Sequence, residues 1–535
     1  MSAHDLDADV AIVGYGPVGQ ALSALLGRAG HRVVVFERFQ EIYRLPRAVH
    51  LDHEIMRMLQ SLDLAEVVAE DLVGVDDYQW FGADGELLLR FDRHGLAPSG
   101  WEGSYMFFQP ELEAAIHDHA CVPAGVTVER GWVADGLADS GDHVKLTLHQ
   151  VGEHEPLART GECRTVRARW VVGADGANSF VRTATGIARR DLGFQERWLV
   201  VDAEPDDMSA LAHLPVASQR CDPKRPTTIV QSGPRHRRWE FMLLPDEQPS
   251  DFEDPRRVWE MLEPWYRPED GPLTRSTVYE FRSMVADQMR QGRVLIVGDA
   301  AHLTPPFLGQ GLCSGLRDAA NVAWKLDLVL RGVAHERLLS TVGAERQPQN
   351  EAVIGLAIEL GKVLCQLDPE AAAERDAMLR AAGPPPPLEL APLTGGLLHQ
   401  PIGEPDPLAG TLSVQGVVER AGREGRLDDV VGSGFQLIVA GGDPLQRLAH
   451  RDRKLLDTLD ATVASLDPGA PHGVRDLDGR LTAWLAQHNA HAVLVRPDFY
   501  VFGAAASQQE VPELLDDLRT QLHLTPKSAT SGVLA

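Results

Sequence analysis

The feature of this sequence that most restricts its fold is a glycine-rich turn near the start of the chain. The turn, Gly14-Tyr15-Gly16-Pro17-Val18-Gly19, follows an apolar run over residues 9–13 and precedes an amphipathic stretch over residues 17–29. A second apolar run covers residues 32–36. Short apolar runs on either side of a helix-length stretch predict a βαβ unit with parallel strands, so we expect an α/β fold whose first domain is of the Rossmann type.

Each glycine of this G-x-G-x-x-G pattern has its own physical role. Gly14 permits the tight turn, Gly16 lets the backbone approach a pyrophosphate, and Gly19 lets the helix pack against the strand. The helix is expected to begin at Pro17, and its unpaired N-terminal amides favour a phosphate. The alternative is a glycine turn at an ordinary strand–helix junction.

An acidic residue at the end of the second strand strengthens the cofactor interpretation. Glu37 lies 23 residues after Gly14 and is placed to accept hydrogen bonds from a ribose diol, with Arg38 beside it. An acid at this position fits an adenosine dinucleotide that lacks a 2′-phosphate. NAD and FAD both satisfy the pattern.

Composition excludes several classes of protein. The 535 residues include 77 acidic and 51 basic side chains, a net charge of −26 that argues against binding to nucleic acid or to an anionic membrane. No apolar run approaches the roughly 18 residues of a membrane span, and the acidic N-terminus is unlike a secretory signal, so we expect a cytoplasmic protein. The cysteines form no C-x-x-C pair, so neither disulfides nor a metal site is indicated; they are Cys121, Cys163, Cys221, Cys313 and Cys365.

The middle of the chain differs in pattern from its start. We expect residues 1–194 to form the first part of the dinucleotide-binding domain and residues 195–284 to form an inserted antiparallel sheet. The β-rich runs of the insert are separated by Pro and Gly turns and cover residues 198–202, 227–231, 238–244 and 276–282.

The first domain is expected to resume over residues 285–383. This segment has a short apolar strand at 293–297, a long buried helix at 311–330 and a helical pattern that continues to about residue 382. Pro384–Pro387 cannot be helix or central strand, so residues 384–424 are expected to be a linker. The last segment, residues 425–535, has strand candidates at 435–439 and 492–496 and a terminal helix at 511–522, which suggests a small α/β domain.

Two later turns each carry an acidic residue after an apolar strand. One is Val172-Gly173-Ala174-Asp175-Gly176-Ala177, followed by Ser179 and Arg182, and the other is Val297-Gly298-Asp299-Ala300-Ala301-His302. With the first turn, they resemble the three motifs of the class A flavoprotein aromatic hydroxylases, which have the p-hydroxybenzoate hydroxylase fold. The resemblance implies that FAD is the bound cofactor.

The resemblance also implies roles for individual residues. Asp299 would bind the ribityl chain of FAD, and Asp175 would join the pyrophosphate region. Arg47 matches the arginine loop that contacts the flavin in the family, and Gln109 matches a second flavin contact. Singly, Asp175 and Asp299 are equally well explained as helix caps.

A third implied contact lies at the start of the long helix. Backbone amides after Gly311, those of Leu312 and Cys313, would stabilise negative charge on the reduced flavin. Pro306 matches a proline that lies near the reaction centre in the family. The substrate ring would therefore lie between the flavin and the inserted sheet, close to Pro306.

The chemistry implied by the family is oxygen insertion into a small phenolic substrate. NADH or NADPH would reduce FAD, O₂ would be captured at flavin C4a, and the distal oxygen of the hydroperoxide would pass to the ring. The sequence has a single dinucleotide fingerprint, which fits enzymes that bind the nicotinamide cofactor only transiently. A phenol is activated by losing its proton, and His50 and Tyr105 are candidate bases by residue type, with packing as the alternative for each.

One branch of the family is similar over most of the chain, the 3-(3-hydroxyphenyl)propionate hydroxylases. The similar segments are residues 221–226, 237–242, 486–490 and 495–498. This similarity implies hydroxylation of 3-(3-hydroxyphenyl)propionate or a related phenylpropanoid to a catechol, with Arg238 as a candidate partner for the substrate carboxylate. The alternative for Arg238 is a surface strand with solvated arginines.

The same branch implies a thioredoxin-like fold for the C-terminal domain. That domain contains no cysteine, so thiol–disulfide chemistry is excluded and a structural or homo-oligomerisation role is left. Two other functions stay open at this point. One is a tailoring or antibiotic-inactivating monooxygenase acting on a polycyclic phenol, and the other is a non-catalytic flavin sensor or carrier.

Overall fold

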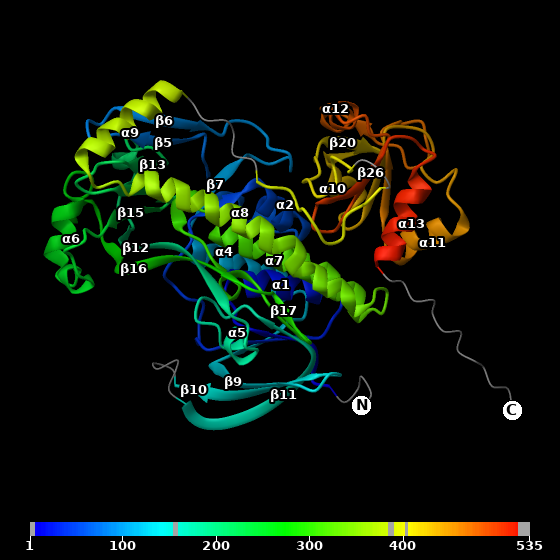
Figure 1. Ribbon diagram of the computed structural model, residues 1–535, viewed down its shortest axis with the longest axis horizontal. Helices are drawn as coiled ribbons and strands as arrows, with labels where there is room; N and C mark the ends of the chain where they lie inside the picture. Colours follow the sequence, from blue (N-terminus) through cyan, green and yellow to red (C-terminus); the bar gives the residue numbers. More distant parts are fainter. Residues whose placement is uncertain (1–5, 153–158, 384–389, 402–404, 523–535) are drawn as a thin grey trace. The chain divides into compact units, whose positions relative to one another are not determined.

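The structure is a computed structural model that describes residues 6–152, 159–383, 390–401 and 405–522 (Figure 1). Its internal contacts divide the chain into two units. The first comprises Met1–Ala319 and Gln349–Ala391, and the second comprises Ala320–Pro348 and Pro392–Ala535. Within the described segments, no helix is both long enough and apolar enough to cross a bilayer.

The first unit contains the predicted Rossmann-type sheet. Its strand order is β17-β18-β11-β1-β2-β8, and β1 pairs in parallel with both β2 and β11. Strands β10 and β9 continue antiparallel from β11, and Figure 1 shows the three strands as a long ribbon at one end of the unit. The strands are β1 (Ala8–Val13), β2 (Val33–Glu37), β8 (Thr127–Arg130), β9 (Trp132–Asp139), β10 (Val144–Val151), β11 (Arg159–Gly173), β17 (Arg290–Gln291) and β18 (Val294–Ile296).

The second large sheet of this unit is the predicted insert, and it is wider than expected. Its order is β19-β16-β12-β15-β14-β13-β5-β6. Strands β5 (Asp77–Phe81) and β6 (Leu87–Asp92), at one end of this order, come from the segment that we assigned to the first domain. They join the sheet because β5 pairs in parallel with β13. The others are β12 (Arg189–Ala203), β13 (Ala217–Arg220), β14 (Thr227–Ser232), β15 (His236–Met242), β16 (Leu273–Ala286) and β19 (His302–Leu303).

Helices and a small sheet complete the first unit. The small sheet has the order β3-β7-β4, with β3 (His50–Asp52), β7 (Ser104–Phe107) and β4 (Leu72–Gly74). The helices are α1 (Pro17–Arg28), α2 (His53–Ser61), α3 (Ala65–Val68), α4 (Gln109–Ile116), α5 (Phe180–Ala184), α6 (Pro255–Leu262) and α9 (Pro369–Ala382).

Two long helices contribute residues to both units. Helix α7 (Gly311–Leu330) has the bounds that its sequence period predicts, and α8 (Thr341–Leu364) follows it. The predicted helical pattern to residue 382 is interrupted before α9, where the Asp368 side chain accepts a hydrogen bond from the Ala371 amide at 2.9 Å and caps the new helix.

The second unit has the predicted thioredoxin-like core. Its sheet has the order β23-β22-β25-β26, in which β22 runs parallel to β23 and antiparallel to β25. The strands are β22 (Gln436–Val439), β23 (Thr462–Ser465), β25 (Ala492–Val495) and β26 (Val501–Ala505), with helices α10 (Leu427–Val431), α11 (His450–Thr458), α12 (Arg480–Gln487) and α13 (Val511–Gln521).

The expected linker is partly folded. Strand β20 (Val417–Arg420) pairs with β21 (Arg423–Arg426) and β24 (Arg475–Asp476), so the C-terminal unit begins before residue 425. Val418 is buried in the core of this unit, which fixes the strand there. The proline run at residues 384–387 lies outside the described residues.

Candidate functional site

The glycine turn after β1 packs against the second acidic turn. Gly14 has φ +100°, and a Cβ on it would lie 2.3 Å from the carbonyl oxygen of Ala174. A Cβ on Gly19 would lie 2.2 Å from the carbonyl oxygen of Gly14. Both positions therefore exclude any side chain, and the segment 174–175 lies directly against the turn.

Gly16 differs from its two neighbours because the space beside it is open. Among the described residues other than its chain neighbours, the only atom within 4 Å of a Cβ at Gly16 is Nη2 of Arg47, at 3.7 Å. Gly16 is the N-cap of α1 and Pro17 its first residue, and the cap carries no side-chain hydrogen bond. An open cradle, free helix amides and one guanidinium together fit the pyrophosphate of a dinucleotide.

Glu37 is held beside the same turn. Its Oε2 accepts a hydrogen bond from the Tyr15 amide at 2.8 Å, and its Oε1 accepts one from the Phe39 amide at 3.0 Å. Each carboxylate oxygen keeps a second lone pair, so the group can still accept from a ribose diol. Arg38 is exposed, and its guanidinium lies 5.0 Å from the Phe39 ring centroid.

Gln109 holds the Arg47 loop in place. Its Oε1 accepts hydrogen bonds from the amides of Arg47 and Ala48, both at 2.8 Å, and its Nε2 donates to Oε1 of Glu113 at 2.6 Å. Burial raises the pKa of Glu113 to about 7. Gln109 thus has a defined part in shaping the loop, whereas its expected contact with a flavin stays a prediction.

Asp175 behaves as a helix cap. Its carboxylate accepts a hydrogen bond from Ser179 Oγ at 2.5 Å and another from the Val181 amide at 3.1 Å, at the start of α5. Burial raises its pKa. The second turn therefore reaches the glycine turn through its backbone, as the cap alternative implies, and the side chain is directed to its own helix.

Asp299 has a different environment. It is exposed in the turn after β18, and no side-chain hydrogen bond to it occurs among the described residues. A Cβ at the preceding Gly298 would lie 3.2 Å from Val18 of α1, and a Cβ at Gly315 of α7 would lie 2.7 Å from the same side chain. The first turn, the third turn and α7 therefore meet around Val18, as the sequence analysis requires.

Asp318 fastens α7 to the third turn. Its Oδ2 accepts hydrogen bonds from the Gly298 amide at 3.0 Å and from His302 Nε2 at 2.6 Å. Its Oδ1 accepts one from Nδ2 of Asn350 at 3.3 Å. This buried carboxylate fixes the first turns of the helix relative to Asp299.

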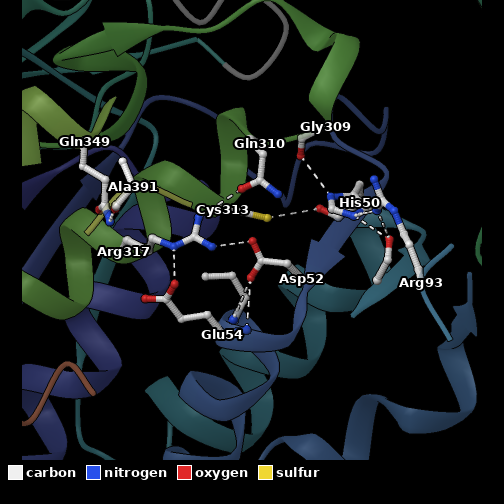
Figure 2. Close-up of polar contacts among 12 residues, drawn as sticks. His50, Asp52, Glu54, Arg93, Gly309, Gln310, Cys313, Arg317, Gln349 and Ala391 are labelled. Carbon is white, nitrogen blue, oxygen red and sulfur yellow. Dashed lines mark hydrogen bonds and ion pairs between the residues drawn. The ribbon is translucent and has the colours of Figure 1, made fainter. Parts of the chain in front are cut away.

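Arg317, the neighbouring residue, fastens α7 on another side (Figure 2). It is buried, donates through Nε to Glu54 at 2.6 Å and pairs through Nη2 with Asp52. It also donates through Nη1 to Oε1 of Gln310 at 3.1 Å. Because Gln310 immediately precedes α7, the cluster fixes the helix N-terminus, whose amides at Gly311, Leu312 and Cys313 have no intrahelical acceptor.

His50 supports the loop before α7. Its Nδ1 lies 3.2 Å from the Gly309 carbonyl oxygen and its Nε2 lies 2.7 Å from Ser104 Oγ. Burial, with the nearby Arg93, lowers the pKa of His50 to about 4, so the ring is neutral at neutral pH. Both ring nitrogens are occupied, which favours the packing alternative for His50.

The other expected residues of this loop are also located. Pro306 is half-buried, and its carbonyl oxygen accepts a hydrogen bond from the Gly309 amide at 2.8 Å. Burial raises the pKa of the Cys313 thiol well above its usual value, and its Sγ lies 3.6 Å from the carbonyl oxygen of His50. Tyr105 alternates with Ser104 on β7, so it points away from His50, and its hydroxyl accepts from the Glu102 amide at 2.9 Å.

Arg238 has no free donor. Its Nε and Nη2 donate to Asp202 at 2.7 and 3.3 Å, and Nη2 and Nη1 donate to the carbonyl oxygens of Pro46 and Arg47 at 2.6 and 3.0 Å. Nη1 also lies 3.5 Å from Oε1 of Glu240. All five N–H groups are therefore engaged. The surface-strand alternative is wrong as well, because every residue of β15 is buried.

Sequence reasoning missed several polar residues of this region. Arg317 and Asp318 lie in a helix that was predicted only from its apolar period, and no local pattern reveals their distant partners. Arg93 follows β6, donates to Ser104 Oγ at 2.6 Å and forms no ion pair with any described residue. Its proximity to His50 depends on the pairing of distant strands, which the sequence does not show.

Comparisons with known proteins agree with this geometry. The family described as "FAD binding domain" matches residues 7–357, and the family described as "HcaD C-terminal domain" matches residues 410–521. A protein of Rhodococcus jostii (strain RHA1) named "Probable NADH-specific resorcinol 4-hydroxylase" is 38% identical over 520 residues, which cover 95% of this chain and 94% of the relative. A "3-(3-hydroxy-phenyl)propionate/3-hydroxycinnamic acid hydroxylase" of Mycolicibacterium gilvum (strain PYR-GCK) is 33% identical over 550 residues, which cover 97% of this chain and 92% of the relative.

Solved structures share the fold. The flavin-dependent monooxygenase PieE, in complex with FAD and substrate, has a TM-score of 0.79 and 24% identity, covering 97% of this chain and all of that chain (100%). Aklavinone-11 hydroxylase, in a ternary complex with FAD and aklavinone, has a TM-score of 0.76 and 23% identity, covering 97% of this chain and 99% of that chain.

Proposed function

From the premise that this chain belongs to the FAD-binding-domain family of class A flavin hydroxylases, we propose that it hydroxylates a small phenol on the carbon beside an existing hydroxyl group. As a member of this family, the chain is an NAD(P)H-dependent flavoprotein aromatic monooxygenase. The observation that carries the proposal is the meeting of the glycine turn, the Asp299 turn and the N-terminus of α7 around Val18. When bound, FAD takes a hydride from the nicotinamide cofactor and supplies an activated oxygen atom from O₂.

The residues of the first unit would divide the work of holding FAD. The amides of α1 and the Arg47 guanidinium, which lies 3.7 Å from a Cβ at Gly16, would bind the pyrophosphate, and Glu37 would accept from the ribose. Asp299 would bind the ribityl chain. The α7 amides at Leu312 and Cys313 would stabilise negative charge on the reduced ring, because the positive end of the helix dipole lies there.

Rigid anchoring is what makes these amides effective. Preorganised donors stabilise a developing charge without reorganisation at the moment of reaction. Arg317 and Asp318 hold the first turn of α7 from two sides, and His50 supports the preceding loop. The buried His50 ring and the apolar cluster around Phe307 would also keep water away from the reaction centre.

The names of the relatives suggest two substrate classes, and the hydrogen-bond donors of Arg238 and Arg93 bear on the choice between them. Arg238 is saturated, which removes the argument that it binds a carboxylate. A neutral dihydroxybenzene such as resorcinol is then the leading candidate, in keeping with the relative that is 38% identical. Arg93 is the observation that favours the second candidate, 3-(3-hydroxyphenyl)propionate, because its guanidinium has unused donors and no carboxylate partner among the described residues.

The experiment is a substrate panel on purified protein. We expect a yellow protein that holds FAD and that NADH bleaches faster under anaerobic conditions when resorcinol is present. In air, it should consume NADH, O₂ and the phenol in equal amounts and form NAD⁺, water and an ortho-dihydroxy product. Protein without flavin, or NADH oxidation that no phenol accelerates, would contradict the proposal. NADPH in place of NADH tests the nicotinamide preference.

A further inference from the structure

Strand β15 carries a glutamate between two residues that each contact a loop of the site. Arg238, Glu240 and Met242 project from the same face of the strand, because side chains alternate along it. Arg238 donates to the carbonyl oxygens of Pro46 and Arg47 at 2.6 and 3.0 Å, and so reaches the Arg47 loop.

At the other end of this row, Met242 reaches the loop before α7. It pairs in register with Trp198, whose ring centroid lies 5.8 Å from that of Phe307. Met242, Trp198 and Phe307 belong to one apolar cluster. Glu240, one step along the same face from both neighbours, therefore lies between the residue that reaches the Arg47 loop and the residue that packs towards Phe307, on the side of the sheet where the substrate ring is expected.

The carboxylate of Glu240 has little to neutralise it. Among the residues that the structure describes, its one charged contact within 4 Å is Nη1 of Arg238, at 3.5 Å, and that guanidinium already makes shorter bonds to Asp202 and to two carbonyl oxygens. The Glu240 side chain lies deep in the protein yet keeps 10% of its surface accessible. The Glu240 side chain is therefore not fully enclosed by the protein.

The surroundings of Glu240 favour a basic carboxylate. Burial raises its pKa, Arg238 lowers it, Asp202 of β12 raises it and Arg275 of β16 lowers it, and the net direction is upward. Its cross-strand neighbour on β14, Thr228, is uncharged and donates to Oε1 of Gln219 at 2.7 Å. A carboxylate with a raised pKa is a stronger general base near neutral pH than an ordinary one.

We propose that Glu240 is the catalytic base that takes the proton from the substrate's phenolic hydroxyl, an inference that rests on the proposed function. The phenol O–H bond breaks, the proton forms a bond to a carboxylate oxygen of Glu240, and the electron pair stays on the phenolate, which makes the ring carbon beside it nucleophilic. The proton leaves with the water that contains the second oxygen atom of O₂. His50 and Tyr105 are less suited, since the His50 ring is occupied and Tyr105 points away.

The experiment compares Glu240→Gln with Glu196→Gln. Glu196 lies on the same face of the sheet, on β12 beyond the Trp198–Met242 pair, and burial raises its pKa in the same direction. Each variant is assayed for FAD content, anaerobic reduction by NADH, and product formed per NADH from pH 6 to about 10, near the pKa of a phenol.

We expect Glu240→Gln to hold FAD and accept hydride normally but to form product about 10²-fold more slowly at neutral pH, with NADH consumed to make H₂O₂. Product formation should then rise roughly tenfold per pH unit towards the phenol's own pKa, because the phenol must ionise unaided. Glu240→Asp should recover part of the neutral activity, and Glu196→Gln should match the wild type.

Three results would overturn the inference. One is a wild-type product yield and pH profile in Glu240→Gln, and another is an equal loss in Glu196→Gln. If Glu240→Gln fails to hold FAD, the decisive variant is Glu240→Asp. Product formation at the full wild-type rate in that variant, with an unshifted pH profile, is the third contradicting result. A wild-type enzyme that hydroxylates no phenol would overturn the proposed function itself, and the two failures are thereby distinguished.

Discussion

The two halves of helix α7 are both anchored by buried charges, but the anchors serve different ends. In the first half, Arg317 binds Asp52 and Glu54 and also reaches the uncharged Gln310 at the start of the helix. Its partners lie on the segments that shape the site. A variant of Arg317 should therefore alter catalysis as well as stability.

The second half of α7 contributes to a closed set of ions. Nζ of Lys325 lies 2.7 Å from Oε2 of Glu345, and Nη2 of Arg496 lies 2.6 Å from both Glu345 Oε2 and Asp498 Oδ2. All four side chains are buried, and the two cations balance the two anions. No member belongs to the candidate site, so this cluster should affect folding alone. The contrast shows that burial and ion pairing do not identify a functional residue unless its partners are also considered.

The largest expected effect is in the second cluster. Glu345→Gln leaves Lys325 and Arg496 with too little negative charge and should cost about 3–5 kcal/mol of stability, read as a lower melting temperature. Product formed per bound FAD should stay at the wild-type value. Asp516→Asn, which removes an exposed pair with Arg519, should change stability by no more than about 0.5 kcal/mol.

The pH dependence of this cluster has a definite sign. The Arg496 and Lys325 cations lower the pKa of Glu345 to about 2, from an ordinary 4.5. A depressed carboxyl pKa stabilises the fold above pH 4.5, and that stabilisation is lost as the pH falls towards 2. Glu345→Gln has no carboxyl group to protonate at this position. Relative to its own stability at neutral pH, the wild type should therefore lose more free energy of unfolding between pH 4.5 and 2 than Glu345→Gln does.

The next effect distinguishes the halves directly. Arg317→Met should lower product formed per NADH by roughly 10- to 100-fold, because the start of α7, which we propose contacts the flavin ring, is no longer held in place. Lys325→Met, on the same helix, should leave that ratio unchanged while lowering the melting temperature. An equal fall in product formed per NADH in both variants would show that the two halves of α7 do not differ in their effect on catalysis.

A smaller effect concerns substrate choice. If the substrate carries a carboxylate, Arg93→Gln should raise the KM for 3-(3-hydroxyphenyl)propionate by about tenfold, the cost of one lost charged hydrogen bond, and leave that for resorcinol unchanged. Unchanged KM values for both phenols would exclude Arg93 as an anion anchor. Arg90→Gln, an exposed change nearby on β6, is the matched control.

Local patterns predicted the skeleton of this protein well. The glycine turn and the bounds of α7 follow from short-range periodicity and turn chemistry, and so does the α/β character of the C-terminal domain. The thioredoxin-like order of its sheet was expected from the family resemblance alone. The meeting of Gly14 with Ala174 was also predictable, because the carboxyl ends of adjacent parallel strands lie at one edge of a sheet.

Long-range side-chain pairing was not predictable. Arg317 and its partners Asp52 and Glu54 are separated by 265 and 263 residues, so nothing in the local sequence indicates their contact. The same holds for Arg238, which looked available for a substrate until Asp202 and the Pro46 carbonyl oxygen were seen to occupy it. Strands β5 and β6 lie in the segment that the sequence assigned to the first domain, yet they join the inserted sheet, because proximity along the chain is a weak guide to strand pairing.

The most direct test of the account is the affinity of the Gly16→Val variant for FAD. Gly16 has φ −72°, which valine can adopt, and, its chain neighbours apart, no atom of the described segments lies closer than 3.7 Å to a Cβ there. We expect apoprotein of unchanged melting temperature whose Kd for FAD rises at least 100-fold, because the new side chain fills the space for the pyrophosphate. A variant that binds FAD as the wild type does would contradict the claim that the three turns form the cradle of the cofactor.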